Sequence, residues 1–413
     1  MKEFDPYQLR KDFPMYQEHD SKFNGKPLVY LDNSATTFKP YSVIEAENHY
    51  YKDITANTRR GDYSLAHEAD VAFESARKTV AKFLNAEIEE ICFTSGDTMA
   101  LNEIAYGLIS HLKKGDEILL SYEEHASNVL PWFQVSKITG AFIRYIPLDE
   151  NGRLSLENYK KCLNEHTKVV SLASVSNVMG YSLPVKEFVK LAHEKGALYI
   201  DDAAQSAPHM KLDVKDSNVD FLAFSGHKLC GPTGIGVLYG KKEALEMISP
   251  TFYGGEMNAR FDSTGYLTLD DLPYRLEAGT QNIAGVLGLE KACEYLMNIG
   301  YDNIHEHELK LRRLAVEGLK KNGNTILYNE DADSGIVTFN IKDVFAQDVA
   351  TYLSSKGVFV RSGQHCAKIL PEYLKTQGTV RASFYIYNTE EDVEAFIKAC
   401  STAEDFLDAF FLE

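Results

Sequence analysis

The feature that most constrains this fold is an alternation of short apolar runs with longer stretches of helical periodicity. The apolar runs are Ile91–Phe93, Glu117–Leu120, Ala141–Pro147, Val169–Ala173 and Ala197–Asp201. Strands that alternate with helices form βαβ units, in which the strands make a mainly parallel sheet and the helices cover both faces. The sequence therefore predicts an α/β fold, whose ligands bind beyond the carboxyl ends of the strands.

The pattern changes after Thr280. Two long helical stretches, 282–298 and 303–321, are followed by shorter strand-like runs. We expect a large domain over residues 22–295 and a small α+β domain built from residues 1–21 and 296–413. A chain of 413 residues is long enough to bury both cores.

Charge and composition exclude several functions. The formal net charge of −17 argues against nucleic acid or an anionic membrane as a partner. No apolar run is long enough to span a bilayer, and the polar first residues do not resemble a signal peptide. The six cysteines form no CxxC pair and no zinc spacing, so we expect no metal site and a reducing, cytoplasmic location.

Two predicted strand ends carry groups that suit a phosphorylated or aromatic ligand. Thr94-Ser95-Gly96-Asp97-Thr98 opens a helix, where free amide N–H groups bind phosphate. Asp97 or Thr98 is equally a simple N-cap, and the Asp97 carboxylate would repel phosphate. His125 follows the next run, where an imidazole stacks on a ring or moves protons, although a lone histidine is more often structural.

Two further strand ends present an amide and an acid. Asn177 follows the run that ends at Ala173 and is free to bond a ligand oxygen. Asp202 follows the run that ends at Asp201, where a buried carboxylate would keep a heterocyclic nitrogen protonated. The alternative for Asp202, a helix cap or a metal ligand, is equally compatible with the local sequence.

The segment from Ser225 to Gly236 places a lysine in a glycine-rich loop between two apolar runs. A lysine at the end of a buried strand loses its proton through desolvation and becomes a nucleophile towards an aldehyde. An ordinary surface lysine in a hairpin is the alternative. On Lys228 alone the surface lysine is the favoured interpretation, and the rest of the chain has to decide between the two.

In this order the residues resemble a pyridoxal-phosphate enzyme of fold type I, in the class V aminotransferase family. The resemblance covers nearly the whole chain, from Leu9 to Thr389. More narrowly, the chain is similar to the cysteine desulfurases of group II, the SUF-system type. The matching motifs are Ser225-Gly226-His227-Lys228, Glu277-Ala278-Gly279-Thr280 and Arg361-Ser362-Gly363-Gln364-His365-Cys366-Ala367.

The resemblance implies a large domain with a seven-stranded, mainly parallel sheet, and it assigns roles to individual residues. Lys228 would bind the cofactor covalently, Asp202 would pair with its pyridine nitrogen, and Gln205 would bond its ring oxygen. The resemblance places the phosphate on Thr98, Ser225 and His227, with Thr280 reaching it from the other subunit of a homodimer. Asp97, next to Thr98, also counts among the cofactor-binding residues. The catalytic residues would be Lys228, Cys366 and His125, and the substrate-binding residues Asn177, Arg361 and Arg381.

The implied reaction is the conversion of L-cysteine to L-alanine, with the sulfur passed to the Cys366 thiolate as a persulfide. A sulfur-acceptor protein would then carry it towards iron–sulfur cluster assembly. Selenocysteine lyase activity on the same scaffold, or a non-catalytic protein that kept the fold, are the alternatives. Ser95 and Asp97 stand where relatives commonly have arginine and threonine, and Gln364 stands where many have a histidine. The segment from Val344 to Asp348 lacks a histidine seen in relatives with zinc-bearing acceptors.

Overall fold

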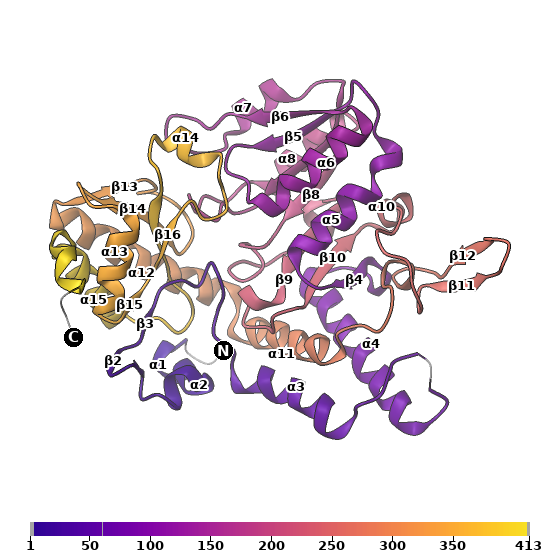
Figure 1. The fold of residues 1–413 in the computed structure, drawn as a ribbon, viewed down its shortest axis with the longest axis horizontal. Helices are drawn as coiled ribbons and strands as arrows, with labels where there is room; N and C mark the ends of the chain where they lie inside the picture. The colour runs from indigo at the N-terminus through magenta and orange to yellow at the C-terminus, as the bar shows by residue number, and fades with distance from the viewer. Residues whose placement is uncertain (1–3, 60, 411–413) are drawn as a thin grey trace.

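The computed structural model describes residues 4–59 and 61–410, and its centre is a seven-stranded sheet (Figure 1). The strands lie in the order β4-β10-β9-β8-β7-β5-β6. Their bounds are β4 (Ile91–Thr94), β5 (Glu117–Ser121), β6 (Phe142–Ile146), β7 (Thr167–Ala173), β8 (Leu198–Asp202), β9 (Phe221–Ser225) and β10 (Gly236–Gly240). All neighbouring pairs are parallel except those of β10, which runs antiparallel to β4 and β9. The predicted α/β fold with a mainly parallel sheet is confirmed.

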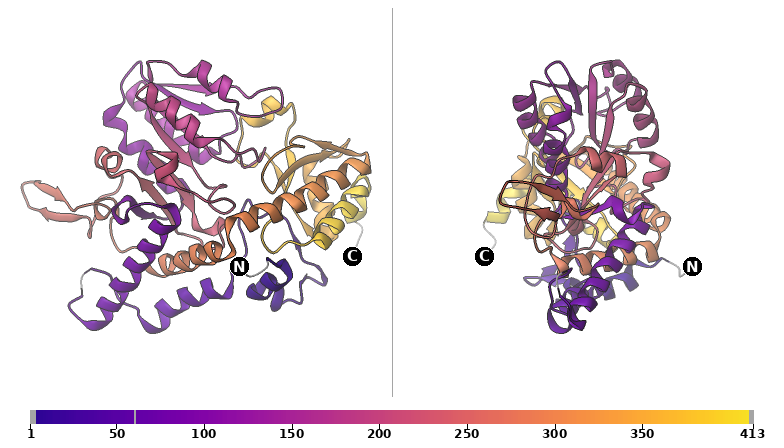
Figure 2. Two further views of the ribbon diagram at one scale, coloured as in Figure 1. Left: turned by 180° about the vertical axis from the view of Figure 1, so that it is seen from behind. Right: turned by 90° about the vertical axis from the view of Figure 1, so that its right-hand side faces the viewer.

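Helices cover both faces of this sheet because successive strand residues point to opposite sides. In β4, Phe93 joins one core with α4 and α11, whereas Cys92 joins another with α5 and α6. Figures 1 and 2 show these helices in layers around the sheet. The helix bounds are α3 (Tyr41–Asp53), α4 (Ser64–Leu84), α5 (Asp97–Gly107), α6 (Leu130–Thr139), α7 (Leu156–Cys162), α8 (Val185–Glu194) and α11 (Ile283–Ile299).

A second, four-stranded sheet lies in the C-terminal part of the chain, in the order β13-β14-β17-β16. It has its own apolar core with the helices beside it. The bounds are α12 (Tyr301–Asn322), β13 (Thr325–Leu327), β14 (Ile336–Ile341), α13 (Ala346–Ser355), β15 (Val358–Phe359), β16 (Arg361–Gly363), α14 (Leu370–Leu374), β17 (Thr379–Ser383) and α15 (Glu390–Ser401).

The N-terminal segment packs against this C-terminal part. The Arg10 guanidinium donates to the Tyr387 carbonyl over 2.7 Å and pairs with Asp392 over 2.5 Å. The short strand β3 (Val29–Tyr30) pairs in parallel with β15. These contacts agree with residues 1–21 joining the small domain, but the domain bounds themselves stay a prediction.

Two 3-10 turns lie near the ends of strands of the large sheet. Ala126–Asn128 precedes α6, and Gly226–Lys228 follows β9, so that Lys228 ends this second turn. The remaining elements are α1 (Pro6–Leu9), α2 (Pro14–Gln17), β1 (Lys22–Phe23), β2 (Lys26–Pro27), α9 (Val214–Ser217), α10 (Lys242–Met247), β11 (Asn258–Phe261) and β12 (Leu267–Leu269). The hairpin of β11 and β12 extends away from the body (Figures 1 and 2). Within the described residues, no helix has the length and apolarity that a bilayer crossing needs.

Candidate active site

The site is built on one edge of the large sheet, where the carboxyl ends of β4, β5, β7, β8 and β9 meet. The loop after β9 reaches this edge only because small residues let backbones approach. A Cβ on Gly236 would lie 2.5 Å from the Gly96 Cα and 2.6 Å from the Phe224 carbonyl oxygen. The approach brings the start of α5 against Ser225, whose hydroxyl accepts from the Asp97 N–H over 2.8 Å.

Lys228 stands at the end of the turn that follows β9, and its side chain is half-buried. Desolvation lowers the pKa of its ammonium, while the nearby Asp97 and Asp202 carboxyls act in the opposite direction. A lysine with a lowered pKa has more of the neutral amine that attacks a carbonyl. The setting supports the nucleophile over the surface-lysine alternative.

Asp202 and Gln205 lie on the β8 side of Lys228, and both are buried. The Asp202 carboxylate accepts from the Ala204 N–H over 3.1 Å. Burial raises its pKa, and the Lys228 charge lowers it again. The Gln205 amide donates to the Ser34 carbonyl over 2.8 Å, and its Oε1 has no partner among the described residues.

The start of α5 carries the most unusual group of the site, the buried carboxyl of Asp97. Its Oδ1 has no hydrogen-bond partner in the described part of the chain. Burial, together with Asp202, raises its pKa well above the usual range. Beside it, the Thr98 and Ser127 hydroxyls lie 2.7 Å apart. A raised pKa favours the neutral acid, which weakens the repulsion of phosphate that the sequence suggests.

Asp97→Asn is expected to remove a pH dependence of cofactor retention. In the wild type, retention falls as pH rises because Asp97 loses its proton and its carboxylate then repels the cofactor phosphate. Asparagine stays neutral, so we expect it to retain the cofactor about tenfold better than the wild type at high pH and equally at low pH. Equilibrium dialysis between about pH 6 and 9, followed by absorbance, measures this. Ser95→Ala, an exposed change in the same loop, is the control, and parallel pH curves for wild type and Asp97→Asn would contradict the prediction.

His125 lies in the loop after β5. Its Nδ1 accepts from the Ser127 N–H over 3.1 Å, so in the neutral ring the proton resides on Nε2. Burial, with Lys228, Arg381 and Arg361 nearby, lowers its pKa to about 4. The imidazole is therefore neutral at physiological pH.

The neighbouring Glu124, which the sequence did not single out, holds this loop to the sheet. Its carboxyl accepts from the Ser121 hydroxyl over 2.6 Å and from the Asn128 amide over 2.8 Å. It also accepts from the Ala173 N–H over 2.9 Å, which joins the loops after β5 and β7. Burial raises its pKa to about 8, so it is largely protonated at neutral pH.

Arg381 and Arg361 are cross-strand neighbours on β17 and β16, and Asp32 lies between them. The Arg381 guanidinium donates to the Asn177 carbonyl over 2.7 Å and to Asp32 Oδ1 over 3.2 Å, and its buried Nε has no partner among the described residues. Arg361 lies 3.9 Å from the other Asp32 oxygen. Asp32 thus offsets the positive charges of both arginines and orients the Arg381 guanidinium. The sequence did not reveal this role.

Cys366 is the only exposed thiol among the six cysteines, which are all unpaired. Its carbonyl accepts from the Ala126 N–H over 2.8 Å, so its loop lies directly beside the His125 loop. The distant segments that carry Lys228 and Cys366 are thereby brought to one site.

Two residues predicted to bind phosphate, His227 and Thr280, form no hydrogen bond to the other predicted phosphate residues that the structure describes. The His227 ring is half-buried with a pKa lowered to about 4 by burial, and its carbonyl accepts from Lys39 Nζ over 2.8 Å. Lys39 is a further residue that the sequence did not reveal. Thr280 is exposed on the turn before α11 and forms no hydrogen bond to the other site residues that the structure describes.

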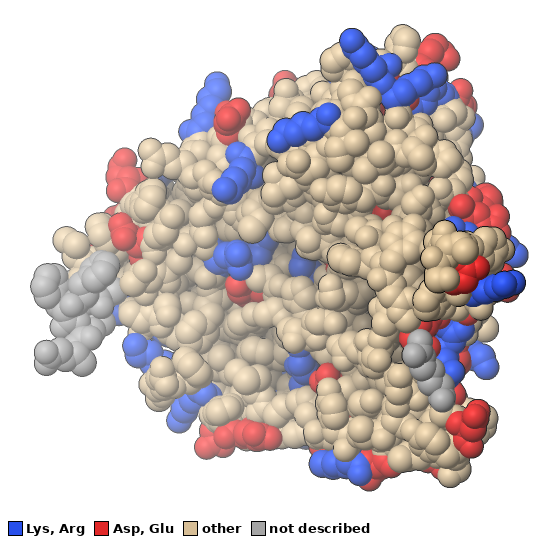
Figure 3. Space-filling model, turned by 45° about the vertical axis from the view of Figure 1, so that its right-hand side comes forward, with Lys and Arg blue, Asp and Glu red and all other residues tan. Residues whose placement is uncertain are grey.

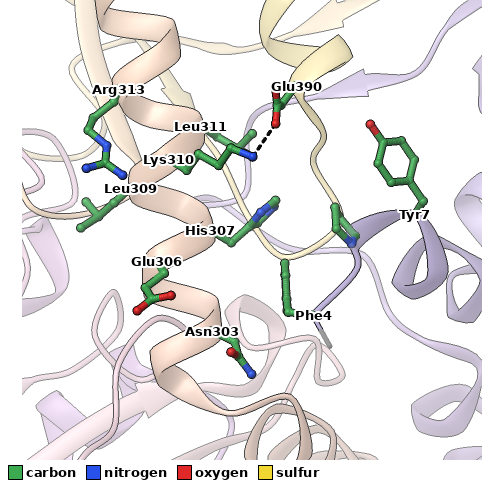
Figure 4. A pocket seen from close by; sticks show the side chains of 11 residues that line it. Phe4, Tyr7, Asn303, Glu306, His307, Leu309, Lys310, Leu311, Arg313 and Glu390 are labelled. Carbon is green, nitrogen blue, oxygen red and sulfur yellow. Dashed lines mark ion pairs between the residues drawn. The ribbon is translucent and has the colours of Figure 1, made fainter. Parts of the chain in front are cut away.

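A separate cavity of about 680 Å³ lies between the N-terminal segment and α12 (Figure 4). Phe4, Tyr7, His307 and Lys310 line it, and Lys310 pairs with Glu390 over 2.5 Å. None of the predicted site residues lines this cavity. No cluster of three or more metal-ligating side chains occurs among the residues described.

The fold and the half-buried lysine flanked by carboxyls define an enzyme of fold type I. The family model "Aminotransferase class-V" matches residues 29–396, so the chain belongs to the class V aminotransferase family. It is 45% identical over 410 residues to a probable cysteine desulfurase of Halalkalibacterium halodurans, covering 98% of this chain and 99% of that one. The cysteine desulfurase CsdA of Escherichia coli shares the fold with a TM-score of 0.90 and 36% identity, over 98% and 99% of the two chains. An apo cysteine desulfurase of Thermococcus onnurineus gives a TM-score of 0.91 and 38% identity, over 97% and 98%.

These similarities confirm the predicted family, the cysteine desulfurase assignment and the pyridoxal 5′-phosphate cofactor. The residues present fit that cofactor. The Asp202 carboxylate suits a cationic ring nitrogen, and the Thr98 and Ser225 hydroxyls with the α5 amides suit a phosphate. Buried polar atoms without a protein partner, Gln205 Oε1 and Asp97 Oδ1, belong to the same group of residues.

Proposed function

We propose that this enzyme removes the sulfur of L-cysteine and receives it on Cys366 as a persulfide, leaving L-alanine. The observation that carries the proposal is the bond between the Cys366 carbonyl and the Ala126 N–H, since it holds the backbone of this exposed cysteine beside the loop of His125. In the balanced reaction, the carbon–sulfur bond of cysteine breaks and a sulfur–sulfur bond to Cys366 forms. The substrate Cβ, from which the sulfur leaves, keeps the electron pair and takes a proton to become the methyl group of alanine.

Each residue of the proposed site has a different role in this reaction. Bound pyridoxal phosphate would supply a sink for the electrons released at the substrate Cα. Lys228, once its amine is free, removes and returns a proton at Cα, and neutral His125 would stack on the ring. Arg381, oriented by Asp32 and the Asn177 carbonyl, offers its open Nε–H to the substrate carboxylate. Arg361 and Asn177 complete this pocket. The site residues stay predictions until they are tested by mutation.

A single-turnover experiment without reductant tests the reaction. We expect one alanine per cofactor and the added mass of one sulfur atom on the peptide that contains Cys366. Sulfide should appear only when a thiol reductant or an acceptor protein is added. Free sulfide in step with alanine, and no mass change on Cys366, would contradict the persulfide. A rate on L-selenocysteine with a negligible rate on L-cysteine, even with acceptor present, would instead identify a selenocysteine lyase.

We further propose that the sulfur passes to an acceptor protein of the SUF type for iron–sulfur cluster assembly in the cytoplasm. The exposed thiol supports transfer to a protein, and six unpaired cysteines suit a reducing compartment. The segment from Val344 to Asp348 offers no histidine, which favours an acceptor without zinc. Adding candidate acceptors one at a time and measuring sulfide release tests this. A rate unchanged by every acceptor would contradict it.

A homodimer, with Thr280 reaching the partner's phosphate site, is part of the same proposal. The Gly279 N–H donates to the Gly255 carbonyl over 2.7 Å, so the Thr280 turn adjoins Phe252 and Tyr253, whose side chains are 56% and 60% exposed. Phe261 on the hairpin is 71% exposed. Large exposed apolar side chains of this kind mark protein interfaces. Sedimentation that finds only monomers carrying cofactor would contradict the dimer.

A further inference from the structure

The loop that carries Cys366 joins β16 to α14 in a backbone conformation that side chains disfavour. His365 has a φ of +51° and Cys366 a φ of +59°, so two successive residues occupy the left-handed region. For residues other than glycine this conformation is strained, because the Cβ comes too close to the backbone. It persists only where surrounding contacts hold it.

Two of these contacts come from the loops at the edge of the large sheet. The Asn177 side-chain amide donates to the His365 carbonyl over 2.8 Å. The Ala126 N–H donates to the Cys366 carbonyl over 2.8 Å. The two strained peptide units are therefore tied to the segments after β7 and β5, which carry the predicted substrate and cofactor residues.

The third contact comes from β17 through the His365 ring. Nε2 lies 2.9 Å from the Thr379 hydroxyl and 3.1 Å from the Thr379 carbonyl oxygen. Because a carbonyl oxygen only accepts, Nε2 carries the proton and donates. Burial lowers the pKa of His365 to about 3, so the ring is neutral and its Nδ1 has no partner among the described residues. The bond does not change over the physiological pH range.

We propose that Thr379 and His365 are positioning residues, which fix the Cys366 thiol where it can reach the sulfur of the substrate. The inference rests on the proposed role of Cys366. Thr379 lies on the same strand as Arg381, two residues away, so one strand positions both the carboxylate ligand and the sulfur acceptor. Arg381 in turn donates to the Asn177 carbonyl, while the Asn177 side chain holds the loop. The distance between bound substrate and thiol is thereby set by a short chain of hydrogen bonds.

Thr379→Val tests the proposal because it keeps the shape of the side chain and the Thr379 carbonyl but removes the hydroxyl. We expect kcat for L-cysteine to fall about tenfold at a nearly unchanged KM, since a misplaced nucleophile slows the chemical step and not substrate binding. Thr379→Ser restores the hydroxyl and should restore most of kcat. Thr325→Val, on β13 at the far edge of the same sheet, is the matched control.

Hydrogen–deuterium exchange on the protein with cofactor and without cysteine gives a readout independent of catalysis. The Ala126 amide and the peptide around Cys366 should lose protection in Thr379→Val and not in Thr379→Ser or Thr325→Val. Unchanged exchange and kcat in Thr379→Val would overturn the proposal. Changed exchange with unchanged kcat would show that Thr379 holds the loop but that the position of the loop does not affect turnover. That result would contradict the proposed role of Cys366.

If Thr379→Val does not fold, two changes of His365 decide the matter. His365→Gln keeps a donor near Nε2 and is expected to retain protection of the Ala126 amide, whereas His365→Met is expected to lose it. Equal protection in both would overturn the proposal.

Discussion

Replacing Lys228 by alanine is expected to abolish alanine formation from L-cysteine, with a loss of about 10⁴-fold or more in rate. The variant loses both the amine that binds the cofactor covalently and the base that moves the substrate proton. The absorbance near ~420 nm, expected of the covalent link between lysine and cofactor, should disappear together with activity. Alanine measured in reactions quenched at set times gives the rate, and a spectrum of the purified protein gives the absorbance of the covalent link.

Lys242→Ala is the matched control because Lys242 is exposed at the start of α10. We expect it to keep both the absorbance and the rate. A Lys228→Ala protein that still shows the band and a substantial rate would mean that another amine carries the cofactor. Lys39, whose pKa is lowered to about 8 by burial, would then be the amine to test next.

Cys366→Ala is expected to lower the rate on L-cysteine by about 10²-fold or more, since no thiolate remains to take the sulfur. The covalent cofactor band should be unchanged, because Cys366 lies on a loop outside the residues that hold the cofactor. The two variants therefore separate cofactor binding from sulfur transfer.

Cys162→Ser, at the end of α7, controls for a general effect of removing a thiol. Cys366→Ala should keep a larger share of its rate on L-selenocysteine, because selenium leaves carbon more easily and depends less on the thiol. Full activity of Cys366→Ala on L-cysteine would contradict the persulfide mechanism.

One face of the molecule is hollowed in its middle, with a few basic and acidic side chains in the hollow and mostly other residues around it (Figure 3). The whole chain is acidic, with a formal net charge of −17. A substrate carboxylate therefore needs local cationic groups, and Arg361 and Arg381 are the ones we propose for it.

Much of the fold and of the site could be predicted. The alternation of apolar runs and helices reports burial on both faces of a sheet, and burial is a local property of each run. Lys228, Asp202 and His125 were found because they follow such runs directly. The structure places their side chains at one edge, where the charges of Asp97 and Asp202 act on Lys228.

The remaining residues could not be found in this way because their partners are distant along the chain. Asp32 acts on Arg381, 349 positions away, and Thr379 acts on Cys366 only through the ring of His365. Asp97 is the opposite case: the sequence suggests a repelling carboxylate, and only its burial beside Asp202 raises the pKa of that carboxyl well above the usual range.

The sequence by itself determined the fold class, the family and the residue types of the reaction, since these depend on periodicity and on short motifs. The tertiary structure alone decided which protonation states those residues hold and how the thiol is positioned. Protonation depends on desolvation and on neighbouring charges, and the strained Cys366 loop depends on hydrogen bonds from three other segments. Both are set by packing between parts of the chain that no local pattern connects.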